Sequence, residues 1–248
     1  MNIARPTALT AALLSTAALA GGVSGTVLDE QGRPIANALV WVQPALSGYG
    51  SSGNLVEVRT DAKGRYKAES LLNTPYFVKA WRTLKFEGQT YCHRLGMARA
   101  SDYASFVPKG TGVRDFKAQF RGLIGDELSN AGTFGGEVRA MHDFDDESDV
   151  HEAREIVVTY TPLALAGGGS LKAFTRTVST GKVLMEDIPI GRYRVTAVAA
   201  MPSGEQRPLK VSVDDETYAA SAVLTFKPTG KCDAGSGLER AFLYYSGE

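Results

Sequence analysis

The segment from His142 to Glu152 holds the densest group of side chains that could perform chemistry. Asp143, Asp145 and Glu147 alternate along it, and carboxylates gathered in a loop supply the hard oxygen ligands that calcium prefers. The sixth position of this loop is Ser148, however, where an EF-hand requires glycine. The pattern therefore favours a solvated acidic loop between two strands, with a calcium site at Asp143, Asp145 and Glu147 as the alternative.

Two histidines flank these acids without a recognisable ligand spacing. His142 and His151 lie nine positions apart (151 minus 142) in the same segment, which matches no recurring transition-metal pattern. The chain also lacks a Gly-x-Ser-x-Gly nucleophile turn. We therefore predict no catalytic residue, no metal and no cofactor. A hydrolase with an unrecognised site, tested by mutating these histidines, remains an alternative.

Four aromatic residues lie in a stretch that is longer than a sandwich loop needs, between residues 81 and 120. They are Trp81, Tyr91, Tyr103 and Phe106. Long ordered loops on a rigid β-scaffold often form binding surfaces. The rings could stack on a sugar, as in a carbohydrate-binding module, or contact a partner chain. The alternative is that the four side chains cover the hydrophobic core.

The first twenty residues have the pattern of a secretory signal peptide. Arg5 supplies the positive start, residues 8–18 the short apolar core, and Ala18-Leu19-Ala20 a small-x-small cleavage site. The mature chain is then expected to begin at Gly21 and to reside in the periplasm, the cell envelope or the extracellular space. No later apolar run is long enough to span a bilayer.

The composition argues against a polyanionic partner. Lysine plus arginine and aspartate plus glutamate both number 27, so removal of Arg5 with the signal leaves 26 minus 27, or −1. We therefore expect neither nucleic acid nor an anionic membrane surface as a partner. The 228 residues that remain (248 minus 20) suit two domains. The 27 glycines and the short β-branched or aromatic runs favour an all-β chain.

Cys92 and Cys232 are the only cysteines. In an exported chain a lone pair of cysteines is usually joined, and here the bond would attach the C-terminal segment to the first domain. On the chain-entropy model, closing a loop of about 140 residues stabilises the folded state by about 4 to 5 kcal/mol. Two free thiols are the alternative, because the sequence does not show that the sulfurs meet.

Two turn motifs organise the first half of the chain. Residues 60–66, Thr-Asp-Ala-Lys-Gly-Arg-Tyr, place a glycine-dependent turn between strands, and residues 76–80 alternate as Tyr-x-Val-x-Ala. Residues 25–34 read Gly-x-Val-x-Asp-x-x-Gly-x-Pro before an Ala-x-Val strand. This ordered set, from Val23 to Ala80, resembles the carboxypeptidase regulatory-like domain, a transthyretin-like β-sandwich related to repeat modules of bacterial surface adhesins. Asn73-Thr74-Pro75 departs from the Pro-Gly that the family usually has there.

The motif recurs later in the chain. Four residues return 117 positions on, in the same order: Gly64 as Gly181, Tyr76 as Tyr193, Val78 as Val195 and Ala80 as Ala197. The repeat predicts a second, similar sandwich that opens at Gly135-Gly136-Glu-Val138. The alternative is two ordinary hairpins that converge on one pattern. Further strands are expected at Glu155–Thr161, Leu171–Thr177, Leu209–Val213 and Ala220–Phe226.

The prediction is an all-β protein with two tandem transthyretin-like or Ig-like β-sandwich domains after a signal peptide. The expected segments are the signal at 1–20, a first sandwich with an inserted hairpin and loop at 21–120, a linker at 121–133, a second sandwich at 134–228 and a C-terminal tail at 229–248. The resemblance implies a non-catalytic structural or interaction module that presents loops or edge strands to an envelope protein or a glycan. The sequence leaves the oligomeric state open.

Overall fold

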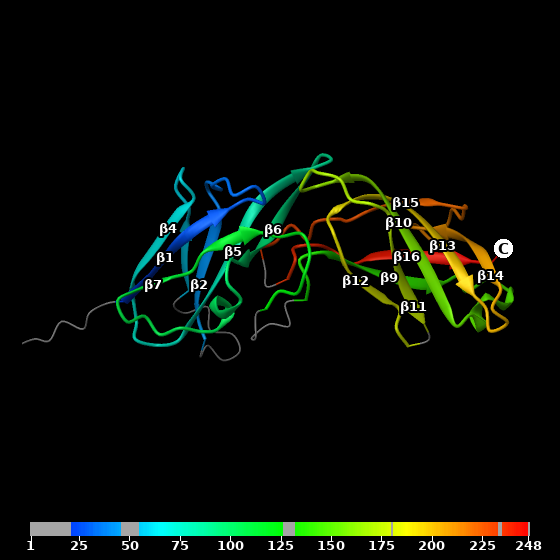
Figure 1. Ribbon diagram of the computed structural model, residues 1–248, viewed down its shortest axis with the longest axis horizontal. Helices are drawn as coiled ribbons and strands as arrows, with labels where there is room; N and C mark the ends of the chain where they lie inside the picture. The colour runs from blue at the N-terminus through cyan, green and yellow to red at the C-terminus, as the bar shows by residue number, and fades with distance from the viewer. Residues whose placement is uncertain (1–20, 46–54, 126–131, 180, 233–234, 248) are drawn as a thin grey trace, which may run out of the picture.

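The computed structural model is an all-β protein whose two halves lie side by side along its long axis (Figure 1). It describes residues 21–45, 55–125, 132–179, 181–232 and 235–247. Within these ranges the helical elements are two short 3₁₀ turns, η1 (Ala100–Tyr103) and η2 (Asp149–Glu152). No helix in the described ranges is long and apolar enough to cross a membrane. The predicted signal at 1–20 lies outside the described residues.

The first sandwich is one eight-stranded sheet that folds back on itself. Its described strands follow in the order β3-β2-β5-β6-β8-β1-β4, with β7 paired to β1. Their bounds are β1 (Gly21–Leu28), β2 (Leu39–Pro44), β3 (Val56–Arg59), β4 (Arg65–Leu71), β5 (Tyr76–Phe86), β6 (Gln89–Met97), β7 (Thr111–Val113) and β8 (Phe116–Ala118).

The second sandwich repeats this topology. Its described strands follow in the order β11-β10-β13-β14-β16-β9-β12, with β15 paired to β13. Adding eight to each strand number of the first order gives the second order, so the main path through the two sheets is the same. The bounds are β9 (Gly136–His142), β10 (Glu155–Leu165), β11 (Phe174–Ser179), β12 (Leu184–Ile188), β13 (Gly191–Ala200), β14 (Gln206–Ser212), β15 (Ala222–Thr225) and β16 (Ala241–Ser246). The four further strands predicted from the sequence correspond to β10, β11, β14 and β15.

The tyrosines found 117 positions apart occupy equivalent corners. Tyr76 begins β5 and Tyr193 lies near the start of β13, and both side chains are buried. The Tyr76 hydroxyl accepts a hydrogen bond from the Leu72 backbone N–H at 3.2 Å, and the Tyr193 hydroxyl donates to the Pro189 carbonyl at 2.8 Å. Each tyrosine thus fixes its strand to the backbone four residues upstream. The shared corner supports the predicted pair of similar domains, and their origin by duplication is our proposal.

Alternating apolar residues build the two cores. In β13, Tyr193, Val195 and Ala197 point inward and are buried, while Arg192 and Arg194 are exposed. This period of two buries one face of a strand and leaves the other in water. The buried residues of the strands form one large hydrophobic cluster inside each sandwich.

The segment predicted as a C-terminal tail contains a strand of the second sheet. β16 lies between β14, with which it pairs antiparallel, and β9, with which it pairs parallel. Its Leu243 side chain is fully buried in the second core. The prediction of a tail at 229–248 was therefore wrong for residues 241–246. The strand was missed because its partners lie far away in the sequence and its apolar residues do not alternate clearly.

The ends of the predicted linker pair with one another. Leu123 and Thr133 form an isolated antiparallel bridge, and the Phe134 N–H donates to the Gly122 carbonyl at 3.0 Å. Phe134 is buried and, with Ile124, forms a small satellite cluster against Tyr103. The described parts of this segment are thus ordered by their own contacts.

Candidate functional site

A disulfide joins the two sandwiches. Cys92 in β6 is bonded to Cys232, which follows β15, with a Cα–Cα distance of 5.2 Å and a sequence separation of 140. The predicted pairing is confirmed. The bond lies close to the turn of the β5–β6 hairpin, where Glu87 and Gly88 adopt positive φ values of 46° and 77°, as a two-residue hairpin turn requires.

Tyr91 lies at the contact between the sandwiches. Its side chain is 1% exposed, and its hydroxyl donates to the backbone carbonyl of Phe226 at 2.8 Å. Nearby, Arg192 Nε lies 3.3 Å from Glu87 Oε1 in an ion pair that also crosses from one sandwich to the other. The predicted binding residue Tyr91 is therefore part of an internal interface, and its ring is not offered to a ligand.

The other three predicted aromatic residues pack on the first sandwich. Trp81 is fully buried, with its ring 4.7 Å from that of Trp41. Tyr103 is half-buried and accepts a hydrogen bond from the Met97 N–H, whereas half-buried Phe106 packs against the first core. Burial removes Trp81 as a stacking platform for a sugar, because its ring faces contact protein instead of solvent.

The acidic loop is organised around a residue that was not singled out from the sequence. Asp146 accepts hydrogen bonds from the backbone N–H groups of Gly247, at 2.7 Å, and Ser148, at 2.9 Å. Burial alone would raise the pKa of Asp146, but these bonds outweigh it and hold the pKa well below its usual range. Within the described ranges no group of three or more His, Cys, Asp and Glu side chains is placed to hold a metal ion. Asp143, Asp145 and Glu147 are thus not gathered into a calcium cage.

The two histidines of this loop have structural partners. His142 Nε2 lies 3.0 Å from Asp146 Oδ2, and the His142 ring packs 5.5 Å from the ring of Tyr245 on β16. His151 Nδ1 lies 3.0 Å from the Ser148 backbone carbonyl oxygen. Neither imidazole is bonded to a hydroxyl or a thiol, so the loop does not hold an activated nucleophile at these positions.

A buried polar cluster beneath the contact between the sandwiches was also not anticipated. His93 is fully buried and stacks on Phe120, with ring centroids 4.6 Å apart. Arg82 Nε lies 3.3 Å from His93 Nδ1, and the Arg82 guanidinium forms an ion pair with Glu30. Burial, with a further effect of the Arg82 charge, lowers the pKa of His93 to about 3. The histidine is therefore neutral in the folded protein, and nothing in the local sequence signalled this environment.

This histidine makes stability depend on pH. The unfolded chain binds a proton at His93 near pH 6.5, whereas the folded protein does so only near pH 3. Its contribution is complete above pH 6.5 and is lost as the pH falls toward 3, with a loss of about 2 kcal/mol between pH 7 and pH 5. Urea unfolding at both pH values should show a smaller difference for His93→Gln than for the wild type. His151→Gln, on the surface, is the control, and an unchanged difference in His93→Gln would contradict the assignment.

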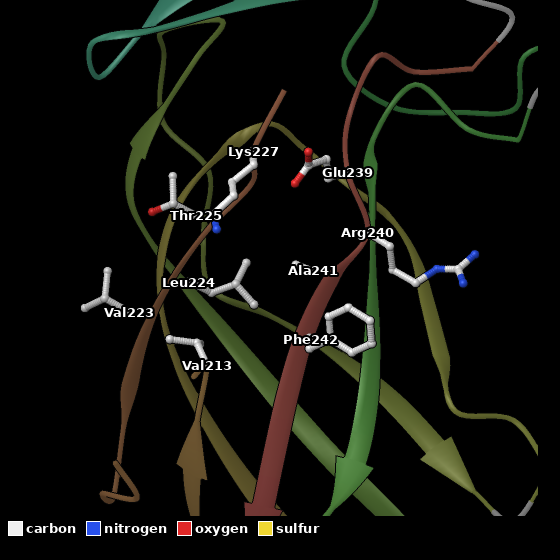
Figure 2. Close-up of a pocket in the computed structure, with 9 residues that line it drawn as sticks. All are labelled: Val213, Val223, Leu224, Thr225, Lys227, Glu239, Arg240, Ala241 and Phe242. Carbon is white, nitrogen blue, oxygen red and sulfur yellow. The ribbon is translucent and has the colours of Figure 1, made fainter. Parts of the chain in front are cut away.

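The recess shown in Figure 2 is a groove between β15 and β16. The chain between these strands forms a hairpin whose closed end is fixed by the Glu239 N–H, which donates to the Lys227 carbonyl at 2.8 Å, and by a bridge between Pro228 and Leu238. Beyond this point the two strands diverge, and Leu224 points into the space between them. The groove encloses about 450 Å³.

Exposed apolar side chains lie beside polar ones at the mouth of the groove. Val213, Val223 and Phe242 line it from the end of β14, from β15 and from β16, and are 40%, 52% and 40% exposed. Leu224 and Ala241 form its inner wall. A cluster of exposed large apolar side chains around a concave surface is typical of a binding site.

The sequence predicted only one wall of this groove. The strand at Ala220–Phe226 was predicted, but residues 241–243 were assigned to the tail, so the two walls of the groove could not be brought together. The one available signal was the apolar run at the start of β16, Ala-Phe-Leu, in a segment otherwise rich in glycine and charge.

Comparison with protein families agrees with the predicted resemblance. A family model for the carboxypeptidase regulatory-like domain matches residues 22–103. No curated protein matches the chain. The matched residues 22–103 comprise most of the first sandwich.

Several solved structures show distant similarity. The minor pilin GBS52 of Streptococcus agalactiae is 11% identical over 92% of this chain and 96% of that chain, with a TM-score of 0.31. A DUF3823 family protein from Bacteroides uniformis is 13% identical over 83% and 99%, with a TM-score of 0.26. The major pilin subunit BcpA of Bacillus cereus is 11% identical over 85% and 70%, with a TM-score of 0.26. At these TM-scores the similarity supports no statement about function.

Proposed function

We propose that this chain, whose first sandwich is a carboxypeptidase regulatory-like domain, is an exported, non-catalytic interaction module that binds a protein of the cell envelope or periplasm. Its two sandwiches form one scaffold, joined by the segment at 121–133 and by the Cys92–Cys232 bond. A disulfide persists in oxidising compartments, which supports residence outside the cytoplasm. The signal-like residues 1–20 support the same location.

The main support for the proposal is the groove between β15 and β16, which lies beside the Cys92–Cys232 disulfide that joins the sandwiches. The hairpin that closes the groove also carries Cys232, so the disulfide fixes that hairpin to β6 of the first sandwich. Gly237, in the same hairpin, lies so close to β6 that a Cβ there would be 2.2 Å from the Cys92 carbonyl oxygen. The groove is thus built against a fixed support, and fixed recesses bind with a lower entropic cost than mobile ones.

The environments of the histidines support a binding role over catalysis. In the described part of the chain, His93 is buried beside Arg82, His142 contacts Asp146, and His151 contacts a backbone carbonyl. A hydrolase of the Ser-His or Cys-His type would instead need an imidazole hydrogen-bonded to its nucleophile.

A protein partner is favoured over a glycan by the position of the aromatic rings. Protein modules that bind sugars present aromatic faces to solvent, and two of the four predicted platforms, Trp81 and Tyr91, are buried. The groove instead offers aliphatic side chains and one phenylalanine, together with Thr225 and the charged side chains of Lys227, Glu239 and Arg240. Glycan binding thus has no exposed platform at these two positions.

An affinity capture from native envelope extract tests the proposal. The bait is oxidised Gly21–Glu248, and the comparison bait carries Cys92→Ser and Cys232→Ser. We expect a stoichiometric protein partner on the oxidised bait and at least about tenfold less of it on the double variant, whose groove has lost its support. A third bait, Leu123→Lys, changes a side chain that is 79% exposed and distant in sequence from the groove walls, and should capture as the wild type does. Absence of any partner on all baits would contradict the proposed function.

A further inference from the structure

We infer that the groove between β15 and β16 receives an extended, apolar polypeptide segment of a partner protein, which adds to the second sandwich as a strand. The inference rests on the proposed function and identifies its site and the chemistry of its partner. It follows from unpaired strand edges, from the way the first sandwich fills its own corresponding gap, and from the charges around the groove.

Two strand edges face the groove without a strand partner. Two strands share one edge of β13. β14 pairs with residues 197–200 of β13, and β15 pairs with residues 192–195 of β13. β14 then leaves β13 and pairs with β16 at residues 244–246. In the described part of the chain, the outer edge of β15 and the edge of residues 241–243 therefore pair with no strand. Unpaired edges of this kind accept an added strand through main-chain hydrogen bonds.

The first sandwich shows what belongs in such a gap. The register gives the correspondence: Leu224 is opposite Tyr193 in the second sandwich, as Phe106 is opposite Tyr76 in the first. On the other wall, Ala241 is opposite Val138 as Gly112 is opposite Val23. Phe106 and Gly112 thus occupy the positions of Leu224 and Ala241.

In the first sandwich the gap is filled by an aromatic ring. A Cβ on Gly112 would lie 3.4 Å from the Phe106 ring, so the ring packs directly on the β7 backbone. The Arg114 guanidinium covers the ring at 4.8 Å from its centroid. In the second sandwich the smaller Leu224 leaves this volume open. An occupant that supplies a large apolar side chain would restore the packing of the first sandwich.

The course of the chain explains why the second gap stays open. In the first sandwich the connection from Phe106 to β7 is short and stays on the sandwich, because β7 begins at Thr111. In the second, β15 ends at Thr225 and β16 begins at Ala241, and the connection between them extends to the disulfide at Cys232. The segment that could have covered the groove is thus fixed to the first sandwich instead.

The charges at the groove favour an uncharged strand. Arg240 is neutralised by Glu137, whose Oε2 lies 2.9 Å from Arg240 Nη2. Lys227 and Glu239 lie together at the closed end and carry opposite charges. The rim is therefore close to electrically balanced, which disfavours a polyanion such as an acidic glycan, a nucleic acid or an anionic lipid surface.

Binding of defined peptides tests the inference. The probe is an array of eight-residue peptides in which Val, Ile, Leu, Phe or Trp alternates with Thr, each also made with N-methyl groups on alternate amides. The proteins are oxidised Gly21–Glu248, the variant Leu224→Phe with Ala241→Gly, and Val223→Lys. The double substitution reproduces the residues that close the first sandwich. Val223→Lys changes only a rim side chain that is 52% exposed, so it tests the groove even if the double variant does not fold.

We expect peptides with a central aromatic residue to bind the wild type, and to bind both variants at least about tenfold more weakly. N-methylation of one of the two alternating sets of peptide amides should weaken binding to a similar extent. That set faces a strand edge, and N-methylation removes its main-chain hydrogen-bond donors. Backbone amides of residues 223, 225 and 241–243 should become protected from hydrogen exchange. Val113→Lys, at the position in β7 equivalent to Phe242, is the matched control and should bind like the wild type.

Several results would overturn the inference. They are no binding by any peptide, equal binding to the wild type and to both variants, or no effect of N-methylation. Self-association of the wild type that both variants abolish would assign the groove to a second copy of this chain, and binding to a glycan array would assign it to sugars. If the envelope partner is captured equally by the wild type and the groove variants, the proposed function stands and this site is wrong.

Discussion

The Cys92→Ser, Cys232→Ser variant is expected to lose about 4 to 5 kcal/mol of unfolding free energy relative to the oxidised wild type. The bond spans a sequence separation of 140 and joins two separate sandwiches. Without the disulfide the unfolded chain gains conformational entropy, because the long loop is no longer closed. The folded chain loses the covalent link between its sandwiches. The Tyr91–Phe226 hydrogen bond and the Glu87–Arg192 ion pair do not depend on the disulfide, so they still connect the two sandwiches in the variant.

Guanidinium unfolding of the oxidised wild type, the reduced wild type and the double variant measures this difference. The reduced wild type is the matched control, since it breaks the same bond without changing a side chain, and its midpoint should agree with that of the double variant. Equal midpoints for the oxidised and reduced wild type would show that the clamp does not contribute to stability.

Phe226→Ala is expected to lower the unfolding free energy of the second sandwich by about 4 kcal/mol. Its side chain is fully buried and belongs to the second core. It packs so closely on β9 that a Cβ on Gly136 would lie 2.3 Å from the ring. Removal of the ring leaves a cavity that the fixed backbone of β9 cannot fill.

The matched control is Phe242→Ala, which removes the same side chain from the mouth of the groove, where it is 40% exposed, and should cost less than about 1 kcal/mol. Circular dichroism follows both sandwiches. Tryptophan fluorescence follows the first alone, because both tryptophans, Trp41 and Trp81, lie there. In Phe226→Ala the circular dichroism transition should begin at lower denaturant than the fluorescence transition. Equal losses in both variants would show that Phe226 does not hold the second core together.

Local patterns were sufficient to predict several strands and turns of both sandwiches. The alternating Tyr-x-Val-x-Ala residues and their recurrence in β13 depend on neighbours within a few positions, and the structure confirms the alternation in β13. The disulfide was predictable from the number of cysteines and the expected compartment. These features need no knowledge of which strands meet.

Features that depend on distant pairing were not predictable. β16 was assigned to a tail because its neighbours, β9 and β14, are identified only by the sheet itself. Trp81 and Tyr91 were candidates for a binding surface, since their sequence does not reveal that protein covers both rings. The environment of His93 arises where Arg82, Phe120 and Glu30 meet from separate segments. The groove is a further case, because its walls are brought together by the fold.

The central place of β16 affects the order in which the two sandwiches fold during synthesis. β9 and β16 pair in register at Val138 and Ala241, 103 positions apart (241 minus 138), so the second sandwich cannot close until this late strand has emerged. All the strands of the first sandwich emerge earlier, and domains generally fold in chain order. On this order of folding, Cys92 is a free thiol on a folded first sandwich until Cys232 has been synthesised. Formation of the bond therefore follows the folding of the first sandwich and connects it to a second sandwich that still needs β16.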